Sequence, residues 1–202
     1  MQGGVIRRLM TIGAVAIAST LLLAGCTTDQ FAQDYRDGGN KNYVAGDGSI
    51  LEITPQNRGA EVTFDGVTDA GLNVSSSDYL GRVLVVNFWA GYCAPCRVEA
   101  PDLEALSQKW ADSGVSFLGV NTYDEPETAQ AFSRTYGVTY PSIIDAKSGV
   151  VQLAFAGDIP PSALPTTIVL DGKGRVAARI LGQVESASIL DSIIKTVITE
   201  EK

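Results

Sequence analysis

The spacing of apolar side chains changes at a few definite points along this chain, and the sharpest change lies near the middle. The strand-like run from Val83 to Phe88 begins with four continuous apolar residues (83–86), which is typical of the buried central strand of a parallel sheet. Directly after it, apolar residues recur at spacings of three to five, which predicts an amphipathic helix that Pro101 should kink. The predicted core-facing positions of this helix are Val98, Leu103, Leu106 and Trp110.

Strand-like and helix-like segments alternate through the rest of the chain, as in α/β domains. The pattern predicts a strand (115–120), a helix from residue 125, a short strand (140–145), a short helix (150–156), two strands (164–170 and 176–180) joined by a turn, and a core-facing helix (186–199). Ahead of the central strand, short β-type runs at 51–53, 61–64 and 72–74 predict a small hairpin.

The first 49 residues have a different character. Arg7 and Arg8 precede an apolar run (9–25), which is typical of a secretory signal, and residues 26–49 are rich in Asp, Asn and Gly, which predicts a flexible tether. Leu23 to Cys26 resembles the bacterial lipobox, in which the cysteine carries the lipid. An uncleaved anchor is an alternative, although 17 residues rise only about 25 Å against the ~30 Å hydrocarbon core, and simple secretion is another. We therefore expect a signal (1–25), a tether (26–49) and an extracytoplasmic domain (50–202) held at the bacterial cell membrane through Cys26.

Composition narrows the possible functions. The 202 residues are 45% hydrophobic, enough for one good-sized core, and the formal net charge of −8 argues against a nucleic-acid partner. The chain contains no histidine, which excludes Cys-His and Ser-His nucleophilic sites, His-ligated metals and a haem-attaching CxxCH motif.

Candidate chemistry is concentrated where the central strand gives way to the helix. The free N–H groups of the helix start should lower the pKa of Cys93, the predicted exposed nucleophile, while Cys96, one turn further on, suits the resolving thiol. Zinc would need four ligands, whereas the chain has three cysteines and no histidine, and a purely structural disulfide would close too short a loop to gain much stability. If Cys26 is lipidated, Cys93 and Cys96 can pair only with each other or with a partner protein.

The segment from Trp89 to Pro101 resembles the signature W-x-x-W-C-x-P-C-R-x-E-x-P of TlpA-like or ResA-like thioredoxin-fold reductases, with Tyr92 in place of the second Trp. The resemblance implies a thioredoxin fold with an N-terminal β-hairpin extension and a central helix-strand insertion. It also implies that Trp89 and Tyr92 shape an apolar surface beside Cys93.

The resemblance assigns roles to three further residues. Pro165 resembles the cis-proline that thioredoxin folds place opposite their dithiol, where it would present the backbone of Leu164 to an extended substrate, although a trans turn proline is an alternative. ResA-like proteins use a Glu at the position of Glu99 in thiol titration. Because Asn87 stands where thioredoxins carry a buried Asp, and an amide cannot release a proton, Glu99 is the nearest candidate for proton transfer. The alternative is an ordinary solvated glutamate.

The function that this resemblance implies is reduction of protein disulfides on the extracytoplasmic side of the membrane, without a cofactor. Its favoured substrate is oxidised apocytochrome c, with electrons from a membrane protein of CcdA or DsbD type. A disulfide-forming oxidase would use the same residues, and a binding module with an inert disulfide is a third possibility. A peroxiredoxin-like peroxidase is disfavoured, because it would need a Thr where this chain has Ala90.

Overall fold

The computed structural model describes residues 43–44, 49–157 and 163–201. The predicted signal, Cys26 and the first part of the predicted tether lie outside these residues. Two residues of that predicted tether are part of the fold, because Tyr43 and Val44 form a strand that pairs with residues 51 and 52. Within the described residues, no helix is both long enough and apolar enough to cross a membrane.

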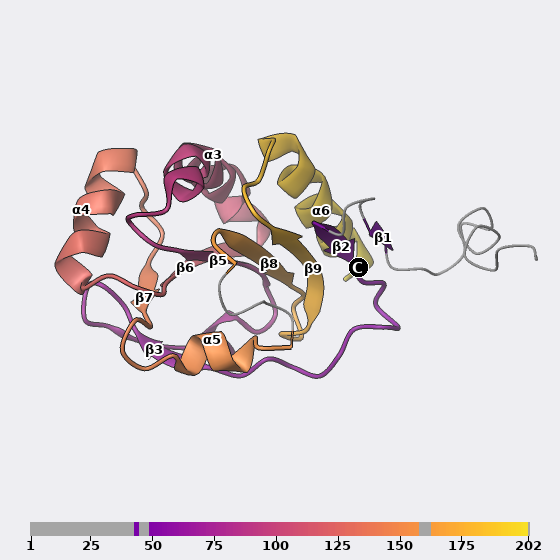
Figure 1. Cartoon of the computed structure of the whole chain (residues 1–202). Helices are drawn as coiled ribbons and strands as arrows, with labels where there is room; N and C mark the ends of the chain where they lie inside the picture. Colours follow the sequence, from indigo (N-terminus) through magenta and orange to yellow (C-terminus); the bar gives the residue numbers. More distant parts are fainter. Residues whose placement is uncertain (1–42, 45–48, 158–162, 202) are drawn as a thin grey trace, which may run out of the picture. The chain divides into compact units, whose positions relative to one another are not determined.

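A seven-stranded sheet, in the order β1-β2-β9-β8-β5-β6-β7, forms the centre of the domain (Figure 1). Its strands are β1 (Tyr43–Val44), β2 (Ile50–Glu52), β5 (Val83–Trp89), β6 (Val115–Asn121), β7 (Ser142–Ile144), β8 (Thr166–Leu170) and β9 (Val176–Leu181). Strand β5 pairs in parallel with β6 and antiparallel with β8, so the sheet is mixed and the prediction of a parallel sheet was wrong. A strand covered on both faces has the same apolar run whichever way its neighbours point.

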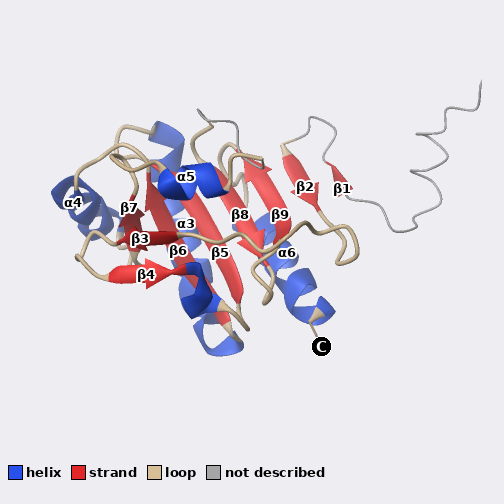
Figure 2. Ribbon diagram, turned by 90° about the horizontal axis from the view of Figure 1, so that it is seen from below, coloured by secondary structure: helices blue, strands red, loops and turns tan. Residues whose placement is uncertain are grey.

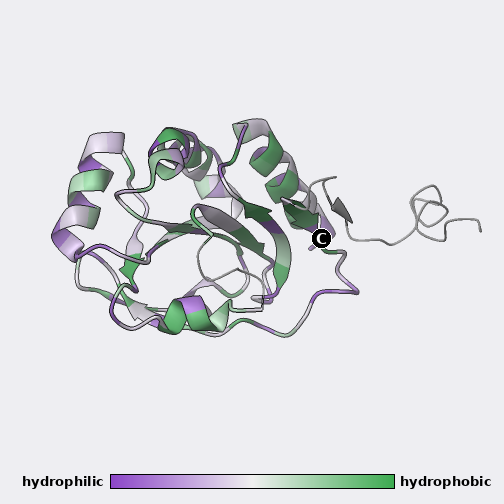
Figure 3. Cartoon of the chain, viewed as in Figure 1, coloured by the Kyte–Doolittle hydropathy of each residue, from purple (hydrophilic) through white to green (hydrophobic). Residues whose placement is uncertain are grey.

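The side chains of β5 alternate between two cores. Val83 and Val85 contribute to the core beneath helices α3 (Ala94–Trp110) and α6 (Ala187–Glu200). Leu84, Val86 and Phe88 contribute to the core on the other face, which helix α5 (Val150–Ala154) covers (Figure 2). The colouring by hydropathy shows apolar residues gathered on the strands and on α6 (Figure 3). This double covering fixes the end of β5, where the cysteines follow.

The predicted hairpin exists, but its strands are shifted. β3 (Asp65–Val67) and β4 (Asn73–Ser75) pair antiparallel in a separate two-stranded sheet, whereas residues 61–64 form no strand. Gly66 lies within β3, and the close approach of β7 favours glycine there, since a Cβ would sit 2.5 Å from the Ile143 side chain. The 3-10 turn η2 (Ser76–Tyr79) precedes β5, and the 3-10 turn η3 (Ala111–Ser113) follows α3.

The predicted helix-strand insertion is present as α4 (Pro126–Tyr136) followed by β7. Helix α3 is continuous through Pro101, and the kink stays a prediction. The prediction for Val98 was wrong, since this side chain is 63% exposed. The buried face of α3 contains Glu99, Leu103 and Leu106, which leaves Val98 on the opposite side.

Candidate active site

Cys93 and Cys96 form a disulfide at the junction of β5 and α3, with their Cα atoms 5.3 Å apart. Cys93 caps the helix, and the backbone N–H of Cys96 donates to Cys93 Sγ at 3.2 Å. In the reduced protein the same donor and the helix N-terminus favour the thiolate of Cys93. The geometry therefore supports the order of roles predicted from the spacing.

The prediction that Cys93 is an exposed thiol is only partly right. In the disulfide form Cys93 is 6% exposed and Cys96 2%, so Cys93 is the more accessible of two nearly covered residues. Both belong to a small apolar cluster with Trp89, Ala90 and Ala129. The disulfide is therefore almost covered by apolar side chains.

The two aromatic residues of the motif have different surroundings. Trp89 is buried, and its Nε1–H donates to Ser142 Oγ at 3.2 Å while its ring packs on Phe132 with centroids 4.2 Å apart. Trp89 therefore packs in the same apolar cluster as the two cysteines, and its part in shaping the apolar surface beside Cys93 stays a prediction. Tyr92 is exposed and its ring lies against Tyr123, a residue that the sequence pattern did not single out.

Glu99 is buried in the interior, which rules out the alternative of a solvated glutamate. Its Oε1 accepts from Asn87 Nδ2 and its Oε2 accepts from the backbone N–H of Val184, each at 2.9 Å. Asn87 also donates to Thr167 Oγ1 at 3.1 Å. Burial raises the pKa of Glu99 to about 7, although the N–H groups of Val184 and Asn87 act in the opposite direction. A carboxyl with this pKa exchanges protons readily at neutral pH.

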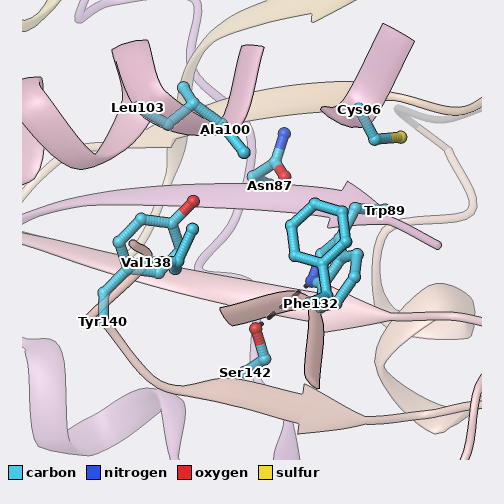
Figure 4. A pocket seen from close by; sticks show the side chains of 9 residues that line it. All are labelled: Asn87, Trp89, Cys96, Ala100, Leu103, Phe132, Val138, Tyr140 and Ser142. Carbon is cyan, nitrogen blue, oxygen red and sulfur yellow. Dashed lines mark hydrogen bonds between the residues drawn. The ribbon is translucent and has the colours of Figure 1, made fainter. Parts of the chain in front are cut away.

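A cavity of about 10 Å³, room for one water molecule, lies behind the dithiol. Figure 4 shows Cys96 and Asn87 reaching it from α3 and β5, and Tyr140 from the segment before β7. Burial, together with the charges of Glu99 and Glu104, raises the pKa of the Tyr140 hydroxyl, which keeps it a donor. Nothing in the sequence pattern distinguished Tyr140 from an ordinary strand residue.

The Leu164–Pro165 peptide bond is cis, as predicted. Leu164 is half-buried and packs against the cluster that contains both cysteines. The carbonyl of Pro165 accepts from Gly182 N at 2.9 Å, which joins this loop to the end of β9.

Hydrogen bonds to the Asp124 carboxylate hold the loop before Cys93 against the end of β6. Asp124 Oδ2 accepts from the backbone N–H of Gly91 at 2.6 Å and from Asn121 Nδ2 at 2.8 Å. Asn121 is fully buried, and its Oδ1 accepts from the backbone N–H groups of Tyr123 and Asp124. Sequence reasoning missed these hydrogen bonds of Asn121 and Asp124, although an Asn at the end of a strand is a known sign of a turn that its side chain stabilises.

No group of three or more Cys, Asp or Glu in the described part of the chain could hold a metal ion. The candidate chemistry at this site accordingly consists of a dithiol, a buried carboxyl and the surfaces around them.

Comparisons with known proteins agree with this geometry. The thiol:disulfide interchange protein HelX of Rhodobacter capsulatus is 39% identical over 124 residues, which are 61% of this chain and 61% of HelX. The thiol-disulfide oxidoreductase ResA of Geobacillus kaustophilus is 33% identical over 113 residues, 56% of this chain and 62% of ResA. The chain thus spans about three fifths of the length of these curated relatives.

The structure of a secreted thiol-disulfide isomerase from Corynebacterium glutamicum matches with a TM-score of 0.68 and 32% identity, over 79% of this chain and 99% of that one. The family model described as Redoxin matches residues 54–197. Because that match covers more than half of the sequence, this chain belongs to the Redoxin family, as a thioredoxin-fold protein with relatives of the HelX and ResA type.

Proposed function

We propose that this chain is a thiol:disulfide oxidoreductase that reduces disulfides of protein substrates. The observation that carries the proposal is the Cys93–Cys96 pair at a helix start with the buried carboxyl of Glu99 behind it. The Cys93 thiolate attacks one sulfur of the substrate disulfide, and the other substrate sulfur leaves as a thiolate that takes up a proton. Cys96 then attacks Cys93 Sγ in the mixed disulfide and releases the second substrate thiol. Two electrons pass to the substrate, and the chain is left with the intramolecular disulfide.

The buried thiol of Cys96 needs a base for the second step. Cys96 is 2% exposed, so bulk water reaches it poorly, and the attacking species must be the thiolate. Glu99 supplies a carboxylate with a pKa of about 7. Glu99 is linked to the lining of the small cavity beside Cys96, because Asn87, which lines it, donates to Glu99 Oε1.

We assign the substrate, the electron donor and the membrane anchor from the resemblance of the motif to TlpA-like or ResA-like reductases. The substrate is oxidised apocytochrome c, the electrons come from a membrane protein of CcdA or DsbD type, and a lipid on Cys26 holds the domain at the extracytoplasmic face of the cell membrane. Leu164 and Pro165 would pair with an extended segment of the substrate. Supporting this assignment are relatives named as interchange proteins and oxidoreductases, and a neighbour whose name marks it as secreted.

A second candidate is oxidation or isomerisation of disulfides with the same residues. It is favoured by the likeness to the secreted thiol-disulfide isomerase, which covers 99% of that chain. The reduction potential of the dithiol separates the two directions. A value near −270 mV supports reduction, and a value near −120 mV supports oxidation.

The test is reduction of insulin and of an apocytochrome c peptide containing a disulfide. We expect Cys93→Ala to abolish reduction and Cys96→Ser to accumulate the mixed disulfide with substrate, which mass spectrometry detects. Full activity of Cys93→Ala would refute the proposal and favour a binding module with an inert disulfide.

A further inference from the structure

Two tyrosines form an exposed aromatic pair at the edge of the candidate site. Tyr92 is 62% exposed and Tyr123 69%, yet their rings touch edge to face, with centroids 4.9 Å apart and planes at 76°. Aromatic rings are normally covered, because each carries a large apolar area. A pair that touches and still faces solvent leaves ring surface available to a ligand.

The pair is held from both sides by the fold. Tyr92 lies in the loop after β5 and Tyr123 in the loop after β6, and these parallel strands end level, with Trp89 opposite Asn121. The backbone N–H of Thr122 donates to the Trp89 carbonyl at 3.1 Å. The Asp124 carboxylate joins the same two loops by accepting from Gly91 N and Asn121 Nδ2. The spacing of the two loops that carry the rings is therefore set before a ligand arrives, which lowers the entropy lost on binding.

We propose that Tyr92 and Tyr123 together bind an aromatic or large aliphatic side chain that flanks the disulfide of a protein substrate, and that Tyr123 is a specificity-determining residue. The site lies beside the reacting sulfur, since Tyr92 immediately precedes Cys93 and the Cys93 N–H donates to the Ala90 carbonyl at 3.1 Å. This inference rests on the proposed function, because its ligand is part of a disulfide substrate.

The charges around the rings favour an uncharged occupant. Arg97 Nη1 donates to the Gly91 carbonyl, which places a cation beside this loop and disfavours a lysine or arginine of the substrate. The Asp124 carboxylate already accepts from two donors, and Glu125 is paired with Lys147 at 2.8 Å. The ring faces carry negative charge density, which disfavours a carboxylate.

The experiment uses three synthetic peptides, each with one intramolecular disulfide, that differ only in the residue next to the attacked cysteine: Phe, Ser or Lys. For the reduced wild-type protein we expect kcat/KM to be about three- to ten-fold higher for the Phe peptide than for the Ser peptide, through a lower KM. Tyr123→Ala should bring this ratio close to one, and Tyr123→Phe should preserve it. Leu80→Ser is the matched control, because Leu80 is an exposed apolar residue just before the start of β5, at the end of the strand away from Cys93. This variant should keep the wild-type ratio.

A Phe preference that survives in Tyr123→Ala, or a wild-type preference for the Lys peptide, would overturn the inference. Reduction of 2-hydroxyethyl disulfide by the wild-type protein tests the proposed function separately, because this compound has no flanking side chain. If it is not reduced, the proposed function fails. If it is reduced and the three peptides react alike, only the aromatic site fails. Tyr123 is exposed, so its substitution should not prevent folding.

Discussion

Replacing Glu99 by Gln should change how the stability of the oxidised protein depends on pH. The folded protein holds the proton of Glu99 more tightly than the unfolded chain, since burial raises the pKa of this carboxyl from 4.5 to about 7. The resulting stabilisation is fully present below pH 4.5 and is lost as the pH rises through 7. The amide introduced by Glu99→Gln has no proton to lose in this range, so the mutant lacks this dependence.

The size of the effect follows from the pKa. A difference of about 2.5 between folded and unfolded states, at 1.36 kcal/mol for each pKa unit, corresponds to about 3 kcal/mol. The wild-type free energy of unfolding should therefore fall by about 3 kcal/mol relative to Glu99→Gln between pH 4.5 and pH 8. Above pH 8 the difference should be constant.

Guanidinium denaturation of both oxidised proteins at a series of pH values measures this difference. The disulfide removes Cys93 and Cys96 from the titration, and the chain has no histidine, so few other side chains titrate between pH 5.5 and 8. Glu104→Gln is the matched control on the same helix. Burial tends to raise the pKa of Glu104, but donors from Thr139 and Gln108 outweigh it and lower the pKa, so this variant should show no change over that range. The reasoning would be refuted if the free energy of unfolding of the wild type, relative to that of Glu99→Gln, stayed constant or rose with pH.

Three further changes test other contacts. Asn87→Asp should move the midpoint of that titration above pH 7, because Glu99 loses a donor and gains a like charge, and a midpoint at or below 7 would contradict the network. Arg58→Met should lower the free energy of unfolding by about 3 kcal/mol, because it removes a buried ion pair partner 3.1 Å from Asp171, and urea denaturation should show a smaller loss for Arg58→Lys. Leu103→Ala should cost about 2–5 kcal/mol by the same assay, against under about 1.5 kcal/mol for Leu103→Met, and equal losses would argue against tight packing beneath α3.

The sequence by itself determined the elements whose signal is local. The apolar run of β5 and the stripe of α6 occur within two residues of their predicted bounds, and a helix follows β5 as predicted, because strand and helix periods are properties of neighbouring residues. The position of the dithiol at a helix start also followed from spacing alone. The cis form of Pro165 followed from the resemblance to thioredoxin folds.

The tertiary structure decided what depends on distant partners. Glu99 is a buried carboxyl because Asn87 and Val184, 12 and 85 residues away along the chain, supply its donors, and no local pattern encodes that meeting. Trp89 became interior for the same kind of reason, since the insertion brings Phe132 and Ser142 onto it. The local order of residues determines which helices and strands form. The burial of a side chain, its pKa and its contacts arise only when segments far apart in sequence come together.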